Sequence, residues 1–502
     1  MRVGRDTRAN GGNGAHLLNL FYLVSLRQPP TVVASVSPMS SQRSAADIRA
    51  DLGHPVIDAD GHVFEHYPAL HQYCLEEGLE GGLYAQMSNC SFNGEPNWSG
   101  LSPDERLARR SFRGPWWALP LANTRDFATA VSPALFHDRI EELGMDFAVC
   151  YPSIGLNFPA YKDDEVRNKL CRALNRYLAD SYQGLQDRLT PVAAIPTHTP
   201  DEAVEQLEFA VTELGFKAVM IGGFVPRQLP AGGEMATWID SLGLDSAYDY
   251  DPLWQRLVDL QTPASLHSGS MGWDGRRSIS NFTYNHMGNF GSASEATAKS
   301  IFFGGVTHRF PELRLGFLEG GVTWGAQMVC DLFSHWEKRG PEGLKAYDPA
   351  RFEPEFFDSL LAEANDPIDL PAGFGRTMQK GISHDEVVND FEAAGITCPE
   401  DILEQIDRSY WFGCEADDPL VRLAFDGALP EGATLNAIFS SDVGHWDVPD
   451  MSEVMPEVWE QVEHGWLNED QFRAFTFGNA HRFFSEARPD FFKGTVLEGV
   501  TV

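Results

Sequence analysis

The 502-residue chain is poor in basic residues and has no apolar run long enough to cross a membrane. It holds 38 Lys and Arg residues against 72 Asp and Glu residues, which gives a formal net charge of −34 at pH 7. A surface of this sign repels nucleic acid and anionic membranes, and a membrane-spanning helix needs at least about 18 apolar residues in succession. The composition therefore argues against nucleic-acid and membrane partners, and it leaves small molecules and metal cations.

Cysteine is also scarce, and its spacing forms no pairs. The chain has seven cysteines, an odd number, without any CxxC motif. This pattern favours buried free thiols in a reducing compartment over a disulfide framework. We therefore expect a cytoplasmic protein.

The first 38 residues precede a second methionine, Met39, and differ from the rest of the chain. An apolar stretch behind three arginines loosely mimics a secretory signal. Asn19 interrupts that stretch, and the leader is rich in Gly and Asn. We therefore interpret residues 1–45 as a disordered or extension segment and expect one large domain over residues 46–502.

From residue 55 onward, short apolar β-type runs alternate with longer helical patterns. The expected strands are Pro55–Asp60, Asp146–Tyr151, Thr190–Ile195, Lys217–Ile221, Pro263–His267, Arg314–Glu319, Tyr410–Cys414 and Asn436–Ser441. The expected helices between them are Asp163–Leu185, Asp201–Leu214 with Asp201 as its N-cap, Pro252–Leu260, Ser294–Phe310 and Val322–Lys338. Alternating β and α segments imply a parallel sheet, and eight such strands predict an α/β fold of the (β/α)8 TIM-barrel type.

Two segments interrupt this alternation and are interpreted as insertions. Residues 66–135, after the first strand, are rich in aromatic residues and turn formers, whereas residues 340–409, after the sixth strand, are acidic and broken by Pro and Gly. In a barrel, segments that follow strands lie at the C-terminal face, where active sites are built. Both insertions are therefore predicted to cap the pocket.

Residues that bind metals or move protons stand at the ends of four expected strands. Asp60 and His62 are two positions apart, so their side chains point the same way and can reach one cation. The other three strand ends carry His267, Glu319 and Asp442. Any one of these residues is explained equally well by ordinary capping or core packing. A closed barrel, however, would bring all four strand ends to one mouth, so we predict a metal site there.

Five further residues are candidates for the same pocket, as additional metal ligands or as substrate contacts. His286 lies in a Gly/Asn-rich segment after the fifth strand, and Glu415 ends the seventh. Trp116, Trp117 and Arg125 would supply apolar walls and an anion contact for an aromatic acid, although ordinary packing within the cap explains them as well.

Six motifs follow one another in a fixed order along residues 55–485. They are Asp58–His62, Arg139–Pro152, Gly215–Val219, His308–Gly321, Ser441–Asp447 and Gly478–Ala480. In this order they resemble the amidohydrolase superfamily, specifically the aminocarboxymuconate-semialdehyde decarboxylase-like branch that is often called amidohydrolase 2. The resemblance implies a distorted (β/α)8 barrel that holds a divalent metal. It also implies a small-molecule substrate, and barrels of this branch are often homodimers.

The resemblance further implies a ligand set for that metal. The positions that match the family's ligands are Asp60, His62, His267 and Asp442. The first of them is commonly His in the decarboxylase type, so Asp60 is a departure. Two carboxylates and two imidazoles suit Zn, Mn or Fe. The fourth strand ends without the lysine that bridges two metals in binuclear relatives, which favours one ion while leaving a second open.

The resemblance also bears on proton transfer. In a hydrolase, Asp442 would take the proton of a metal-bound water, and Glu319 or His445 would pass a proton to the leaving group. In a decarboxylase, Asp442 or Glu319 would protonate the carbon that loses carbon dioxide. The branch often has a catalytic His at the position of Glu319, so this residue is a second departure.

These features predict a metal-dependent hydrolase or non-oxidative decarboxylase that acts on a small organic acid, such as an aromatic or cyclic one, or on a carbonyl compound. An iron-dependent oxygenase with one or two irons is the alternative, because His286, Glu319 and Glu415 are available as extra ligands. A catalytically silent binding protein is a third interpretation, and the intact ligand set argues against it.

Overall fold

The apolar runs of the sequence become buried parallel strands in the computed structural model. It describes residues 43–89, 98–111, 122–229, 237–267, 278–364, 366–382, 389–445 and 447–502. The strands are β1 (Ile57–Val63), β2 (Phe147–Pro152), β3 (Leu189–Pro191), β4 (Ala193–Ile195), β5 (Val219–Ile221), β6 (Val225–Gln228), β7 (Thr237–Asp240), β8 (Ala264–Leu266), β9 (Leu315–Phe317), β10 (Tyr410–Glu415) and β11 (Asn436–Ser440). All eight strands expected from the sequence are confirmed, with β3 and β4 together forming the third.

Hydrogen bonds close these strands into a barrel. One parallel sheet has the order β1-β2-β3 and another has the order β11-β10-β9-β8-β5-β4. Only Val192 separates β3 from β4, and its amide donates to the Cys150 carbonyl of β2. On the other side, the His62 amide donates to the Val443 carbonyl over 2.8 Å, and the Asp442 amide donates to the Asp60 carbonyl over 3.1 Å. The predicted (β/α)8 barrel is therefore confirmed, and its closing contacts lie beside the predicted site residues.

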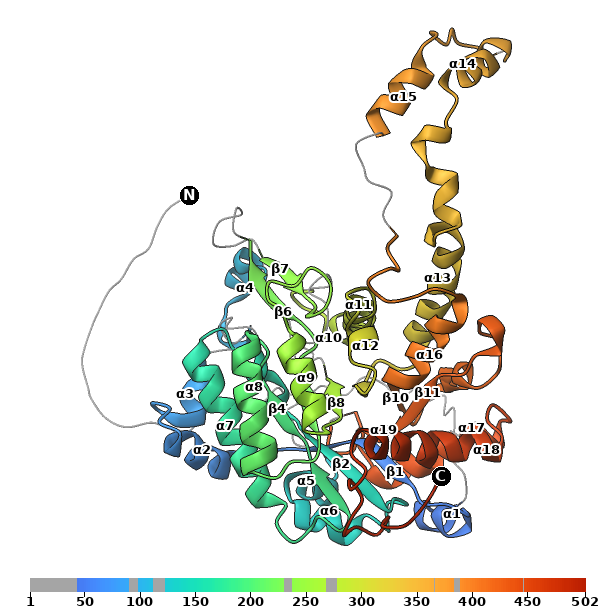
Figure 1. Cartoon of the computed structure of the whole chain (residues 1–502). Helices are drawn as coiled ribbons and strands as arrows, with labels where there is room; N and C mark the ends of the chain where they lie inside the picture. Colours follow the sequence, from blue (N-terminus) through green and yellow to red (C-terminus); the bar gives the residue numbers. More distant parts are fainter. Residues whose placement is uncertain are drawn as a thin grey trace, which may run out of the picture. The chain divides into compact units, whose positions relative to one another are not determined.

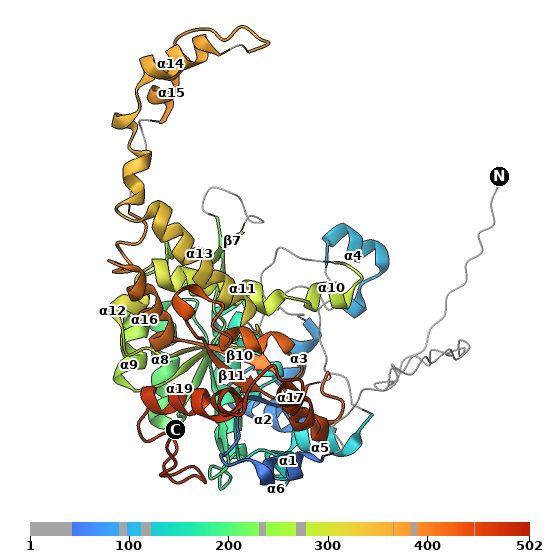
Figure 2. The same ribbon diagram turned by 90° about the vertical axis from the view of Figure 1, so that its right-hand side faces the viewer.

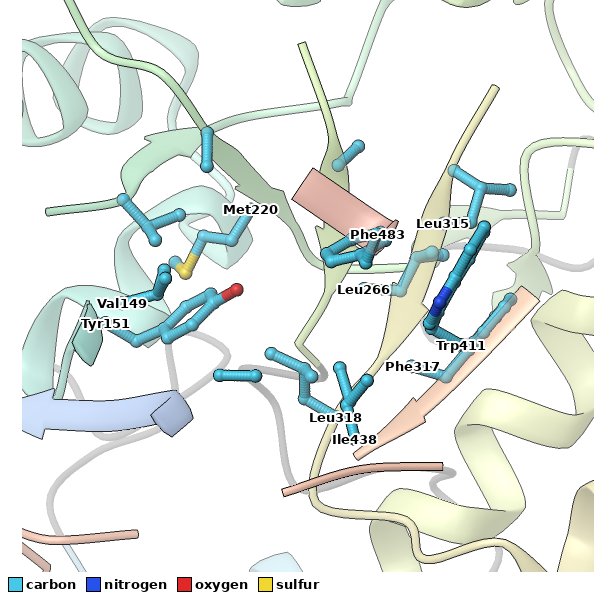
Figure 3. Close-up of a cluster of buried hydrophobic side chains, with 14 of the residues drawn as sticks. Val149, Tyr151, Met220, Leu266, Leu315, Phe317, Leu318, Trp411, Ile438 and Phe483 are labelled. Atoms are coloured by element: carbon cyan, nitrogen blue, oxygen red, sulfur yellow. The ribbon is translucent and has the colours of Figure 1, made fainter. Parts of the chain in front are cut away.

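The centre of the barrel is filled with side chains. Figure 3 shows buried side chains from several strands, among which Val149, Tyr151 and Met220 lie together and Leu318 lies beside Ile438. Parallel strands covered on both faces need continuous apolar runs, which is why the sequence made these strands recognisable. A packed interior places any chemistry at the mouth of the barrel.

Helices cover the outside of the strands, as Figure 1 and Figure 2 show for α8, α9, α16 and α19. The helices are α1 (Ala45–Asp51), α2 (Tyr67–Glu76), α3 (Gly82–Asn89), α4 (Pro103–Arg109), α5 (Thr124–Val131), α6 (Pro133–Arg139), α7 (Asp164–Ser181), α8 (Pro200–Glu208), α9 (Asp251–Asp259), α10 (Phe282–His286), α11 (Asn289–Phe303), α12 (Val306–Arg309), α13 (Thr323–Arg339), α14 (Pro354–Glu363), α15 (Phe374–Ile382), α16 (Pro399–Ser409), α17 (Val454–Glu463), α18 (Glu469–Arg473) and α19 (Asn479–Ala487). Helices α14 to α16 lie within the acidic insertion. None of the helices in the described ranges is both long and apolar enough to cross a membrane.

Two of the differences between the predicted and observed helices have a clear local cause. The N-cap of α8 is Thr199 rather than Asp201, and its hydroxyl accepts from the Glu202 amide over 3.2 Å. Pro200 occupies the first helical position, where a missing amide costs nothing, so the cap precedes it. The expected helix Ser294–Phe310 is broken into α11 and α12 at Gly304–Gly305, where Gly305 has φ of +70°. A backbone in this region interrupts a right-handed helix.

His198, beside the start of α8, gives the fold a pH dependence. Its burial and the charges of Arg167 and Arg227 lower its pKa to about 3 from an ordinary value of 6.5. Between these two values the unfolded chain binds more protons than the folded chain, so stability falls as the pH drops from 6.5 toward 3. Between pH 7 and pH 5 we therefore expect the wild type to lose about 1–2 kcal/mol more stability than the His198→Gln variant. Urea unfolding at both pH values measures this difference, and equal losses in the two proteins would contradict it.

Candidate metal centre

Strand β1 carries three polar side chains toward the mouth of the barrel. Asp58, Asp60 and His62 alternate along the strand and are all buried. The pairing of β1 with β2 shifts register between Asp58 and Gly61. Alternate residues of a strand share one face, so this face of β1 is the polar side of an otherwise apolar interior.

Asp58 ties β1 to the segment that follows β11. Its carboxylate accepts from the Ser441 hydroxyl over 2.6 Å, from the Ser441 amide over 3.0 Å and from the Asp60 amide over 3.2 Å. A side chain at position 61 would clash, because a Cβ on Gly61 would lie 2.5 Å from Asp58 Oδ2. Asp58 therefore fixes the spacing between Asp60 and Asp442. In the sequence, Asp58 was identified only as the first residue of the Asp58–His62 motif, with no role of its own.

Replacing Asp58 with alanine should destabilise the barrel. Three hydrogen bonds to a fully buried carboxylate would be lost, and the amides of Asp60 and Ser441 would be left without this acceptor. We expect the free energy of unfolding to fall by about 3 kcal/mol. The exposed Asp138→Ala is the matched control and should change stability by less than about 0.5 kcal/mol. Urea denaturation of both variants measures the effect, and similar losses in the two would contradict this role.

Glu319 and Asp442 enter the site from strained backbone positions. Glu319 follows β9 and has φ of +54°, and Asp442 follows β11 and has φ of +53°. A residue with a Cβ pays roughly 1–2 kcal/mol in this left-handed region. Strain of this kind persists where the surrounding structure enforces it, and it gathers at functional sites. Both carboxylates are therefore held at the mouth at a cost to stability.

Four side chains from three strand ends form the central group of the site. The atoms that Asp60, His62, His267 and Glu319 offer as ligands lie within 4.8 Å of one another. His62 Nε2 lies 3.4 Å from Asp60 Oδ1, 3.5 Å from Glu319 Oε1 and 3.4 Å from His267 Nε2. His267 Nε2 lies 3.6 Å from both Asp60 Oδ1 and Glu319 Oε1.

Asp442 and His445 form a second group with His62 and Glu319. Asp442 Oδ1 lies 2.6 Å from His445 Nδ1 and 3.4 Å from His62 Nε2. The imidazole rings of His62 and His445 stack with centroids 3.7 Å apart. The predicted ligands and the predicted proton-transfer residues are thus brought together at one place.

The electrostatics of this cluster favour a positive charge at its centre. Burial opposes protonation of His62, but the carboxylates of Asp60 and Glu319 outweigh it and raise the pKa of His62 to about 10. Burial and the charge of Glu319 raise the pKa of Asp442 well above its ordinary value. Burial and the neighbouring charges of His62 and His267 hold the pKa of His445 well below its ordinary value.

The residues of the central group fit a divalent metal ion. Both carboxylate oxygens of Asp60 and the Oε2 atom of Glu319 are buried and lack a hydrogen-bond partner within the described ranges. Buried carboxylates are otherwise paired, or they coordinate metals. Two carboxylates and two imidazoles form a donor set that suits Zn, Mn or Fe. These buried carboxylates therefore need a positive counter-charge, which a bound metal ion would supply.

Two of the additional candidates lie toward this cluster. Burial and the charges of His62 and His267 lower the pKa of His445, and the charge of His286 in α10 adds a smaller effect in the same direction. Glu415, at the end of β10, reaches solvent at the mouth. Protein atoms still crowd its carboxylate, and this desolvation, followed by the charges of Glu319 and Asp417, raises its pKa to about 8. These residues are placed where they can affect the site from its rim.

The remaining candidates are not brought into the cluster. Arg125 donates to both carboxylate oxygens of Glu142 over 2.7–2.8 Å, and its side chain is 65% exposed. A surface ion pair accounts for Arg125, so the predicted anion contact at this residue has no support in the structure. Trp116 and Trp117 lie outside the described residues.

Tyr151 is a neighbour of the site that the sequence did not reveal. It lies at the end of β2, with its ring centroid 6.0 Å from that of His62 and 5.4 Å from that of His267. Its hydroxyl lies 2.6 Å from Ser265 Oγ, and Figure 3 shows the ring among the side chains of the barrel interior. An aromatic residue is ordinary in an apolar strand, so only its place at a strand end indicated that Tyr151 lies near the site.

Comparison with known proteins relates the chain to one family. The sequence profile of the amidohydrolase family matches residues 57–485. A gamma-resorcylate decarboxylase from Rhodococcus jostii is 32% identical over 23% of this chain and 34% of its own length. A gamma-resorcylate decarboxylase from Polaromonas sp. is 26% identical over 38% of this chain and 57% of its own length. The matches to these curated relatives thus span between a third and somewhat over half of their length.

One solved structure matches the chain at lower identity. It is a dihydroxybenzoic acid decarboxylase from Polaromonas sp. with bound manganese and the inhibitor 2-nitroresorcinol. The two chains are 17% identical, with a TM-score of 0.45, and the match covers 87% of this chain and 99% of that one.

Proposed function

Because the chain belongs to the amidohydrolase family, we propose that it is a metal-dependent, non-oxidative decarboxylase of a small hydroxylated aromatic acid. The observation that carries the proposal is the convergence of Asp60, His62, His267, Glu319 and Asp442 at one end of the barrel. Its similarity to gamma-resorcylate decarboxylases supports the reaction type and the substrate class.

The metal would be held by Asp60, His62 and His267 together with a neighbouring carboxylate. When bound, a divalent ion would draw electron density from the carboxylate or phenolate oxygen of the substrate. The protein contributes a buried, pre-formed set of donors, so few side chains need to be reorganised. Asp58 supports this set by fixing the spacing between β1 and the end of β11.

The reaction breaks one carbon–carbon bond and moves one proton. The substrate carboxylate leaves as carbon dioxide, and the electron pair of the broken bond stays on the ring carbon, which takes up a proton. We assign this proton to Asp442, whose Oδ1 lies 2.6 Å from His445 Nδ1. That contact pairs the carboxyl group with an imidazole that can return a proton to it after each turnover.

The first insertion would determine which acid enters. Residues 66–135 directly follow β1, and segments in this position form the walls above barrel active sites, whereas residues 340–409 follow helix α13. Trp116 and Trp117 belong to the first insertion and would supply aromatic contacts for a planar ring. We propose this role for them because of their residue type and their place in the chain.

The test is turnover of 2,6-dihydroxybenzoate by the full-length protein loaded with Mn2+, with products separated by chromatography. The proposal predicts resorcinol and carbon dioxide in equal amounts, loss of turnover with a chelator, and no oxygen consumption. A panel of related hydroxybenzoates identifies the preferred ring. Hydrolysis of amide or ester substrates without any decarboxylation would contradict the proposal, and so would oxygen-dependent turnover.

A further inference from the structure

We propose that the helical hairpin formed by α14 and α15 is an association surface, and that it pairs with the same hairpin of a second copy of this chain. The hairpin lies within the second insertion (residues 340–409) and comprises α14 (Pro354–Glu363), α15 (Phe374–Ile382) and the segment that joins them. The metal centre and the proposed reaction make no use of this part of the molecule.

The hairpin is held in shape by contacts among its own residues. The Asp358 carboxylate on α14 accepts from the amides of Gly373 and Gly375, each over 2.9 Å. The helices also approach closely, because a Cβ on Gly375 would lie 2.6 Å from the Pro354 carbonyl oxygen. Figure 1 and Figure 2 both show α14 and α15 side by side. The hairpin therefore presents a defined surface.

Only part of the apolar residues in the hairpin is enclosed. The ring of Phe357 packs against those of Phe352 and Phe374, with centroid distances of 5.4 and 6.1 Å. Six large apolar side chains remain between 37% and 69% exposed, and they are Phe356, Leu360, Ile368, Leu370, Phe374 and Met378. On each helix two of these side chains stand four positions apart, which places them on one face. Each helix thus offers an apolar face to a partner.

The exposed apolar surface is large enough for a dimer interface. A side chain of this size has about 200 Å² of surface, so six that are about half exposed present about 600 Å². This area lies at the upper end of what one patch on a monomer usually shows. Two hairpins facing each other would bury about 1,200 Å², which is the lower limit for a specific, stable interface.

The charges of the two helices favour a second copy as the partner. Helix α14 carries Glu355, Asp358 and Glu363 without a basic residue, whereas α15 carries Arg376 and Lys380 without an acidic one. Across a two-fold axis, the acidic helix of each copy can face the basic helix of the other, so one contact occurs twice. Two chains with a net charge of −34 otherwise repel each other, and opposite charges at the contact offset this repulsion.

The test is sedimentation velocity of the full-length protein over a range of concentrations. We expect the mass of the wild-type oligomer to fall by half in Leu360→Glu and in Met378→Glu, because a buried charge should raise the Kd of this contact by at least about 100-fold. Both side chains are exposed within one copy, so thermal unfolding should stay cooperative. Leu135→Glu alters an exposed leucine of α6, and this matched control should associate as the wild type does.

A charge exchange tests the identity of the partner. Arg376→Glu removes the net positive charge of α15, and Glu363→Lys makes α14 less acidic, so each variant alone should associate about 10-fold more weakly. In an equal mixture of the two variants, the altered helices can face each other with opposite charges. Association in the mixture should therefore recover toward the wild-type level.

Three results would contradict the proposal. A wild-type protein that stays monomeric up to about 100 µM would overturn it. An oligomer whose mass is unchanged in both Leu360→Glu and Met378→Glu would show that association uses another surface. Failure of the charge-exchanged mixture to recover would overturn the pairing of α14 with α15. None of these results depends on a metal or on turnover, so they leave the proposed function unaffected.

Discussion

Replacing His62 with alanine is expected to abolish metal binding and to lower turnover by at least about 1000-fold. His62 Nε2 lies 3.4–3.5 Å from Asp60, Glu319, His267 and Asp442. Its ring nitrogen therefore contacts all four of these residues, and its ring also stacks on that of His445. Its loss removes a metal donor and leaves the buried carboxylates without their nearest nitrogen, so the central group loses its affinity for a cation.

Metal content and turnover should be measured together on the purified His62 variant. His335→Ala is the matched control, because His335 is an exposed residue of α13 whose ring nitrogen contacts the Asp331 carbonyl. The control should keep wild-type metal content and activity. A His62 variant that retains stoichiometric metal and more than a tenth of the activity would show that the metal binds elsewhere.

Asp442→Asn is expected to lower kcat by about 100-fold to 10,000-fold while changing KM little. Proton transfer by a positioned group contributes this much to catalysis, and an asparagine has no acidic proton to give. The amide also replaces the carboxylate in the 2.6 Å contact with His445 Nδ1. Steady-state kinetics on the metal-loaded variant measure both parameters. The loss should appear in kcat because substrate binding does not depend on this proton.

Two controls decide whether the Asp442 effect is chemical. The metal content of the variant must match that of the wild type, and its thermal unfolding must remain cooperative. The pH profile of kcat should also lose the limb that belongs to the proton donor. An Asp442 variant with wild-type kcat would remove this residue from the reaction.

The barrel could be predicted because its strands are apolar on both faces. Runs such as Tyr410–Cys414 and Asn436–Ser441 are continuous because helices cover one side and the packed interior the other. The β6–β7 hairpin was missed, since Val225–Gln228 and Thr237–Asp240 are short and partly polar. Helix ends at Pro200 and Gly305 depended on single residues whose local effect outweighed the pattern around them.

The site could be predicted as a set of residues but not as a geometry. Asp60, His62, His267, Glu319 and Asp442 were identified because each follows an apolar run. Which carboxylate faces the central group depends on backbone angles at Glu319 and Asp442 that no sequence pattern shows. For a related reason, the sequence could not show that Arg125 pairs with Glu142. A long charged side chain takes the nearest surface partner, here Glu142, and the pattern cannot name that partner.

The most direct test follows 2,6-dihydroxybenzoate labelled with 13C in its carboxylate, incubated anaerobically with the Mn2+-loaded protein. The account predicts release of 13C-labelled carbon dioxide in step with resorcinol. It predicts no release from the metal-free protein, and recovery when Mn2+ is restored. Failure to release label from this acid and from related hydroxybenzoates, in a protein whose metal site is full, would contradict the assignment of decarboxylation to this centre.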